Sequence, residues 1–202
     1  MAKKLILQGL MATIVCFLLL GTFLYTSNSE ATEATKSMRS AFVTYDNLDL
    51  GIKMQYPSSW KIAEEGYDSV SFDSPNVGIA FNIQVIEFPG NIPEKSEKVF
   101  VSGWANKFIS SQEKSKPEYS VIDRTPTTFA GNPAYKVVYT DHTYEEGKEF
   151  KIKGMDTVMV DGKKFYHFMY FSISNSLSNS VETYSKYLPT VNRMLNSVQI
   201  MH

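Results

Sequence analysis

The chain has 202 residues, of which 43% are apolar and 13% aromatic, so it can bury a hydrophobic core and is not a disordered tail. It carries 20 basic and 21 acidic residues, for a formal charge of −1 at pH 7. No block of basic residues marks a surface for phosphates, and this argues against a nucleic-acid-binding protein.

An apolar run from Leu5 to Tyr25 follows two lysines at the N-terminus. As a helix this run would be about 31 Å long, enough to cross a hydrocarbon core about 30 Å thick. Residues 1–4 then stay in the cytoplasm, because basic residues favour that side. We therefore expect a single-pass anchor in the cell membrane, with the globular domain on the extracytoplasmic side. A cleaved signal is the alternative, since Ser27 and Ser29 suit the −3 and −1 positions, and the protein would then be secreted.

Residues 26–40 are mostly small and polar, and they predict a tether between the anchor and one domain over residues 41–202. Cys16 is the only cysteine. It lies inside the apolar run, without the preceding small residues that lipid attachment needs, so we interpret it as a membrane residue. The domain therefore has no disulfide and depends on its core for stability.

Most of the domain alternates apolar and polar residues with the period of two that is typical of strands. In GIAFNIQVIEF, Ile79, Phe81 and Ile83 share one face, while Gln84 points the other way. The preceding run, DSVSFD, is a plausible hairpin partner. Further strands are predicted at YSVIDRT, NPAYKVVYT, EFKIKGMDTVMV and KKFYHFMYFSIS, with Asp161-Gly162 as a tight turn between the last two.

Apolar residues at three- and four-residue spacing predict two helices, one over EKSEKVFVSGWANKFISSQ and one from Tyr184 to Val198. Pro189 in the second helix predicts a kink or two short segments. In KFYHFMYF both strand faces are apolar, which indicates a strand covered on both faces. We therefore predict an α+β fold, with a central antiparallel sheet flanked by helices on both faces as an α/β/α sandwich. A β-sandwich is the competing architecture.

The segment GIKMQYPSSW combines a strand with a Pro-Ser-Ser-Trp turn. Pro57 ends the strand, because proline has no N–H group to donate to a neighbouring strand. Trp60 is then placed either to anchor the sheet edge to the core or to stack on a ligand, and we favour the structural role.

This segment also carries a family resemblance. YDNLDLGIKMQYPSSWKI resembles the opening of PsbP-type domains, and FAGNPAYKVVYTD resembles their glycine turn before a strand. VDGKKFYHFMYFSIS resembles their late hairpin, and YSKYLPTVNRMLNSVQI their closing helix and short terminal strand. The resemblance covers Phe42 to Met201. With its N-terminal anchor, the chain resembles membrane-tethered PsbP-related proteins of archaea.

The resemblance implies the same fold, an antiparallel sheet between helices, and it implies no enzymatic activity. Chloroplast members of the family are extrinsic subunits of photosystem II that help to retain calcium and chloride. Their photosystem-binding residues cannot be matched to positions in this sequence. We therefore carry over no photosynthetic role, because a shared fold does not establish an activity.

Catalytic motifs are almost absent from the sequence. It contains no G-x-S-x-G, H-E-x-x-H, P-loop or G-x-G-x-x-G pattern. We therefore predict no enzyme, no catalytic residue and no cofactor. Of the three histidines, His202 is terminal, and His167 shares a strand face with apolar residues, as expected for a hydrogen-bonded core histidine.

One polar loop, TDHTYEEGKEF, combines Asp141, His142, Glu145 and Glu146. Carboxylates and an imidazole can together bind a divalent metal ion. A solvated hairpin turn has the same composition, and the spacing matches no EF-hand or zinc motif. The sequence therefore leaves open whether this loop binds a metal.

Two functions fit the sequence. The leading hypothesis is a non-enzymatic accessory or interaction module that docks onto a protein partner in a larger membrane-associated assembly. The alternative is a cell-surface protein that binds a small ligand or a divalent metal. The twelve tyrosines fit strand and helix packing, although Tyr144, which lies in the polar loop, is a candidate interface residue.

Overall fold

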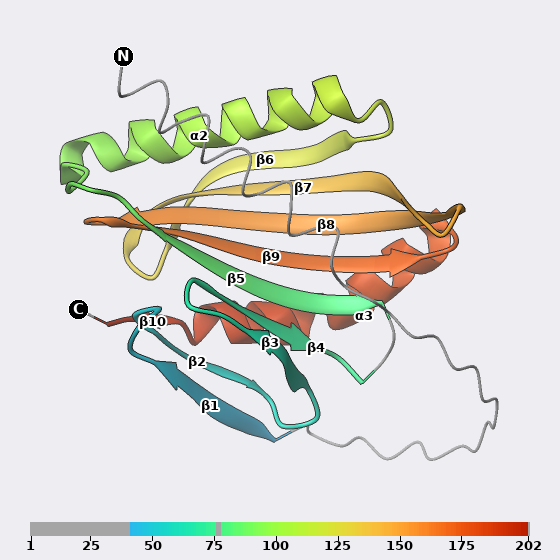
Figure 1. The fold of residues 1–202 in the computed structure, drawn as a ribbon, viewed down its shortest axis with the longest axis horizontal. Helices are drawn as coiled ribbons and strands as arrows, with labels where there is room; N and C mark the ends of the chain where they lie inside the picture. Colours follow the sequence, from blue (N-terminus) through green and yellow to red (C-terminus); the bar gives the residue numbers. More distant parts are fainter. Residues whose placement is uncertain (1–40, 76–77, 202) are drawn as a thin grey trace. The chain divides into compact units, whose positions relative to one another are not determined.

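The computed structural model describes residues 41–75 and 78–201 (Figure 1). The predicted anchor, the tether, Cys16 and His202 lie outside the described residues. The predictions made for them therefore stay predictions.

The described residues form two antiparallel sheets (Figure 1). The large sheet has seven strands in the order β3-β4-β5-β9-β8-β7-β6, and the small sheet has three in the order β1-β2-β10. The large sheet contains β3 (Lys61–Glu65), β4 (Ser69–Asp73), β5 (Ile79–Glu87), β6 (Ser120–Phe129), β7 (Asn132–Glu145), β8 (Lys148–Asp161) and β9 (Lys164–Ser174). The small sheet contains β1 (Phe42–Asn47), β2 (Ile52–Pro57) and β10 (Gln199–Ile200).

Two predicted hairpins have the expected partners. β4 pairs with β5, and β8 pairs with β9 in a register that places Asp161 opposite Lys164. Gly162 follows Asp161 in the tight turn with φ of 59°, a left-handed conformation that glycine adopts without steric cost. This register fixes which side chains of β8 and β9 share a face.

The two helices in the described residues are α2 (Glu94–Ser115) and α3 (Leu177–Asn196). Ser176 caps α3, because its hydroxyl accepts a hydrogen bond from the backbone N–H of Asn179. Pro189 lies inside α3, which is one helix of 20 residues rather than the two short segments that were one predicted outcome. Neither α2 nor α3 is long and apolar enough to cross a membrane.

The central strand β9 shows how the layers are arranged. Trp104 of α2 packs against Phe165 and His167, with ring centroids 4.9 and 5.3 Å apart. Tyr184 of α3 stacks on Tyr170, at 4.7 Å. Successive side chains of a strand point to opposite faces, so the two helices contact different faces of β9. The prediction that β9 is covered on both faces is confirmed by burial of both sets of side chains.

The predicted α/β/α sandwich needs one correction, although an antiparallel sheet with two helices is present. Only one face of the large sheet is covered by a helix without a second sheet beside it, and that helix is α2. The opposite face is shared by α3 and the small sheet, as the contact between Tyr45 of β1 and Phe72 of β4 shows. The cause lies at the end of β2, where Pro57 stops the strand and the chain turns before β3 begins the large sheet.

The main hydrophobic core lies between the large sheet, α3 and the small sheet. Trp60 belongs to it, is only 5% exposed and packs near Tyr187. Its predicted structural role is therefore confirmed. The largest fully buried side chains of this core are Phe72, Phe81, Tyr166, Phe168 and Tyr170.

Candidate functional site

A set of polar side chains lies beneath α2, on the face of the large sheet opposite the main core. Gln84 of β5 is the cross-strand partner of His167 on β9, so the two side chains share this face. Asp156 of β8 lies diagonally across from His167, and its Oδ2 atom is 3.4 Å from the His167 Nε2 atom. Both side chains are almost fully buried, at 3% and 1% exposure.

Two tyrosines extend this polar set toward the end of α2. The Tyr139 hydroxyl donates to the Asp156 Oδ1 atom at 3.4 Å, and the Tyr119 ring packs on Tyr139. Tyr139 can lie flat on β8 because its cross-strand partner is Gly154, where an added Cβ would overlap the tyrosine ring. Desolvation raises the pKa of the Tyr139 phenol well above its usual value, and the Asp156 carboxylate raises it further.

Several buried polar atoms of this set have no hydrogen-bond partner among the described residues. They are Gln84 Nε2, Trp104 Nε1, Tyr119 Oη and both ring nitrogens of His167. The prediction of a buried core histidine is therefore confirmed, whereas its expected hydrogen bond is missing. The helix α2 covers the His167–Asp156 pair. The pair therefore lacks the contact with solvent that a general base needs to reach a substrate.

The closeness of His167 and Asp156 was not predicted from the sequence. The hairpin turn at Asp161-Gly162 nevertheless contained the information needed to predict this contact. The pairing of Asp161 with Lys164 places Asp156 opposite Met169 and Val158 opposite His167. A diagonal contact between Asp156 and His167 follows from that register, because both lie on the same face two pairs apart.

The polar loop considered as a metal site does not form one in the described residues. Asp141 is buried and accepts a hydrogen bond from the Lys116 ammonium group at 2.7 Å. His142, the next residue on β7, points to the other face of the strand. Glu145 and Glu146 lie at the turn between β7 and β8. In the described residues, no three His, Cys, Asp or Glu side chains are placed to share a metal ion.

His142 belongs instead to an ion-paired cluster across β7 and β8. Its Nδ1 atom is 2.9 Å from a carboxylate oxygen of Glu149 and 3.0 Å from the Lys151 ammonium nitrogen. Lys151 also binds Glu149 directly at 2.6 Å, and this hydrogen bond is the largest cause of the lowered pKa of Glu149. Tyr144 is 67% exposed and donates to the same carboxylate. The charged groups of the cluster are therefore paired with one another, and Tyr144 stays at the surface.

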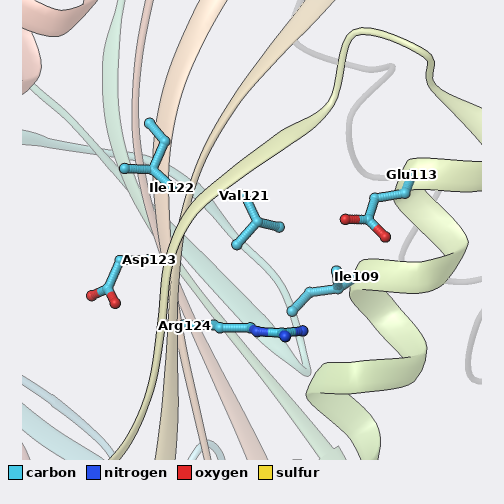
Figure 2. Close-up of a pocket in the computed structure, with 6 residues that line it drawn as sticks. All are labelled: Ile109, Glu113, Val121, Ile122, Asp123 and Arg124. Atoms are coloured by element: carbon cyan, nitrogen blue, oxygen red, sulfur yellow. The ribbon is translucent and has the colours of Figure 1, made fainter.

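A hollow of about 500 Å³ lies between α2 and the edge strand β6 (Figure 2). A β-bulge at Ile122 makes this shape, because it turns Ile122 away while Val121 and Arg124 stay on the helix side (Figure 2). Ile109 and Glu113 of α2 form the other wall. The lining contains no tyrosine, histidine or serine, so it offers an apolar floor with charged groups rather than a nucleophile and a base.

The two most exposed large apolar side chains of the described residues lie on neighbouring turns. Leu48 is 80% exposed in the turn between β1 and β2, and Tyr67 is 88% exposed in the turn between β3 and β4. Glu65 joins the turns, since one of its carboxylate oxygens accepts hydrogen bonds from Tyr45 at 2.7 Å and from Asn47 at 3.0 Å. We call residues 46–51 and 64–68 the two-turn patch.

Comparison with known proteins identifies the family. The sequence pattern of PsbP-like proteins matches residues 6–158, about three quarters of the chain. The chain belongs to the PsbP-like family. The resemblance to PsbP-type domains is therefore confirmed, whereas the likeness to membrane-tethered proteins of archaea stays a prediction, and PsbP-like proteins are not known as enzymes. No curated relative matches the chain.

Several solved structures are similar to this chain, and the first of them, a cyanobacterial PsbP, shows its fold. Cyanobacterial PsbP from Synechocystis is 12% identical, with a TM-score of 0.55, and the match covers 84% of this chain and 98% of that one. LpqN from Mycobacterium tuberculosis, which is involved in cell envelope biogenesis, is 13% identical with a TM-score of 0.47, covering 80% of this chain and 91% of its own. A Pseudomonas aeruginosa protein of unknown function is 12% identical with a TM-score of 0.46, covering 76% and 95%.

Proposed function

We propose that this PsbP-like chain is a non-enzymatic, membrane-anchored protein whose extracytoplasmic domain docks onto a larger membrane-associated assembly. The observation that carries the proposal is the pair of exposed apolar side chains, Leu48 and Tyr67, on two joined turns. Such side chains add nothing to the core but gain free energy when a partner removes them from water.

The polar groups of the domain support the same conclusion. The His167–Asp156 pair lies beneath α2, and His142 is engaged by Glu149 and Lys151. The hollow beside β6 lacks a nucleophile next to a base. A docking role uses the surface of the domain and requires none of these groups to react.

The proposal is tested by purifying the full-length, tagged protein from the membranes of its own cells in mild detergent after chemical cross-linking. We expect the chain in the membrane fraction and a stoichiometric protein partner in the purified material. A matched sample that lacks residues 1–25 reports whether the anchor is needed for recovery. Recovery of the chain alone, with and without cross-linking, would contradict a docking role.

A second candidate function is the binding of a small organic anion at the cell surface. The hollow beside β6 favours it, because Arg124 adjoins the apolar side chains of Ile109 and Val121 there, with Glu113 on the helix wall as the competing charge (Figure 2). An aliphatic or aromatic carboxylate would combine a charge-assisted hydrogen bond to Arg124 with apolar contact. A thermal-shift screen of carboxylates tests this function, with Arg124→Gln as the variant that should abolish any increase in melting temperature.

A further inference from the structure

We infer that the two-turn patch is the docking face of the domain and that it binds a basic protein surface with an apolar socket. This inference rests on the proposed docking function and adds the location of the contact and the chemistry of the partner.

The first argument is that Leu48 is held on a rigid turn. The Asn47 side chain accepts a hydrogen bond from the backbone N–H of Leu50 at 2.9 Å, and the Gly51 N–H donates to the Leu48 carbonyl. Gly51 has φ of 70°, which its lack of a side chain permits. From outside the turn, the Gly51 carbonyl accepts from the N–H of Met201.

The Lys164 ammonium group adds a further support, because it donates to the carbonyl oxygen of Asp49 at 3.1 Å. The turn that carries Leu48 is therefore tied to the C-terminal strand region and to the β8–β9 hairpin. An apolar side chain on such a support loses little backbone freedom when it binds, and this favours affinity.

The second argument is charge. Residues 46–51 and 64–68 contain five carboxylates, which are Asp46, Asp49, Glu64, Glu65 and Asp68, and no basic residue. Lys53 neutralises Asp46 in an exposed ion pair at 2.9 Å, and the Lys164 ammonium group at the Asp49 carbonyl adds a second positive charge. Five carboxylates less these two ammonium groups still leave the patch acidic, with a net charge of −3. The hydrogen bonds described for Glu65 come from the neutral side chains of Tyr45 and Asn47, so its negative charge remains. An apolar centre with this acidic rim is complementary to a basic partner.

The same charge argues against an anionic lipid surface as the partner. Carboxylates near such a surface are repelled over about one Debye length, roughly 8 Å at physiological ionic strength. A leucine and a tyrosine at turn tips would suit a bilayer interface only if the surrounding side chains were neutral or basic. We therefore assign a protein, and not a membrane, to this face.

The test uses site-specific photo-cross-linking of the full-length chain in its own membranes. The photoreactive residue p-benzoylphenylalanine is placed at Tyr67 in one sample and at Val99 in the matched control. Val99 is 74% exposed on α2, which packs on the face of the large sheet opposite the small sheet, so both positions are open to solvent. We expect a discrete protein adduct from position 67 and none from position 99, with the cross-linked peptide of the partner rich in lysine and arginine.

Two variants examine the chemistry of the contact. Leu48→Ser should lower the adduct yield at position 67 about tenfold or more, because the burial of one leucine side chain is lost. The combined Asp49→Asn and Glu64→Gln change should lower the yield and weaken its dependence on salt, because two of the five carboxylates lose their charge. Substitutions at the surface usually have little effect on stability, so neither variant should change the melting temperature of the domain. An unchanged melting temperature therefore serves as the folding control.

The possible results distinguish failure of this inference from failure of the proposed function. A lipid adduct, an equal adduct from position 99, or an adduct insensitive to both variants overturns the inference. If the purification experiment recovers a partner but position 67 gives no adduct, the docking face lies elsewhere and the proposed function stands. If neither experiment detects a partner, both proposals fail.

Discussion

The two faces of the large sheet differ in how they treat buried polar groups. On the α3 face, the Tyr170 hydroxyl donates to the Tyr184 carbonyl at 2.7 Å, and the Ser180 hydroxyl donates to the Ser172 carbonyl at 2.8 Å. On the α2 face, five buried polar atoms, including both His167 ring nitrogens and the Trp104 Nε1 atom, have no hydrogen-bond partner in the described part of the chain, whereas on the α3 face only the Ser172 hydroxyl lacks one there. Since unsatisfied buried groups cost free energy, the α3 face should contribute most of the stability.

The largest expected effect comes from alkaline pH. Burial raises the pKa of Tyr45, Tyr166, Tyr170 and Tyr184 on the α3 face, in the last case to about 12. Above pH 10 the unfolded chain loses these protons while the folded chain keeps them, so stability falls as pH rises. Burial raises the pKa of Tyr119 and Tyr139 on the α2 face as well, so six such groups give a limiting slope of about 8 kcal/mol per pH unit. Urea titrations from pH 8 to 11 measure it, and a flat profile would contradict the burial of these phenols.

Removal of a core ring should have the next largest effect. Phe81 is fully buried in the α3-face core, so Phe81→Ala should reduce the free energy of unfolding by about 3–5 kcal/mol. Phe108 of α2 is 7% exposed and packs on Trp104. Phe108→Ala should cost less, because a single covering helix can move to close the cavity. Urea denaturation compares the two variants, and equal losses would remove the proposed difference between the faces.

Gly154→Ala tests the α2 face by overpacking. The added methyl group would overlap the Tyr139 ring, and we expect a loss of about 1–3 kcal/mol. The double variant with Tyr139→Leu should recover part of that loss, because the obstructing ring is gone. A chemical denaturation cycle of the four proteins measures the coupling. Additive losses would show that Gly154 and Tyr139 do not oppose each other.

The smallest effects come from single polar groups, and they compare the two faces directly. Tyr170→Phe removes a satisfied hydroxyl and should cost about 1 kcal/mol. Gln84→Met removes an unsatisfied amide group of the α2 face with little change in size, and it should cost less than this. Thermal and urea unfolding of both variants decide the order. A larger loss for Gln84→Met would mean that the amide is satisfied in solution.

The secondary structure was largely predictable from local patterns. Alternation placed Ile79, Phe81 and Ile83 on one face of β5 and Gln84 on the other, and the pairing of β5 with β9 agrees. Trp60 was expected in the core and lies there. These predictions depend on side-chain spacing along one strand or turn, which the sequence records directly.

The candidate sites were less predictable. Asp141 and His142 are adjacent in the sequence and suggested a shared metal site, yet they contact Lys116 and Glu149, respectively, on opposite faces of β7. Adjacent strand residues diverge, so closeness in sequence was misleading there. Leu48 and Tyr67 are 19 positions apart and were not predicted to lie on joined turns, because that arrangement depends on how β1 meets β3 through the hydrogen bonds of Glu65.

The sequence by itself determined the family, the antiparallel character of the sheets and the positions of α2 and α3, because periodicity and turn chemistry are local properties. The tertiary structure alone decided that β1, β2 and β10 form a separate sheet, and that this sheet shares one face of the large sheet with α3. It also decided that His167 is buried beside Asp156. Those outcomes depend on which distant surfaces bury each other, and a strand pattern specifies a buried face without naming its partner.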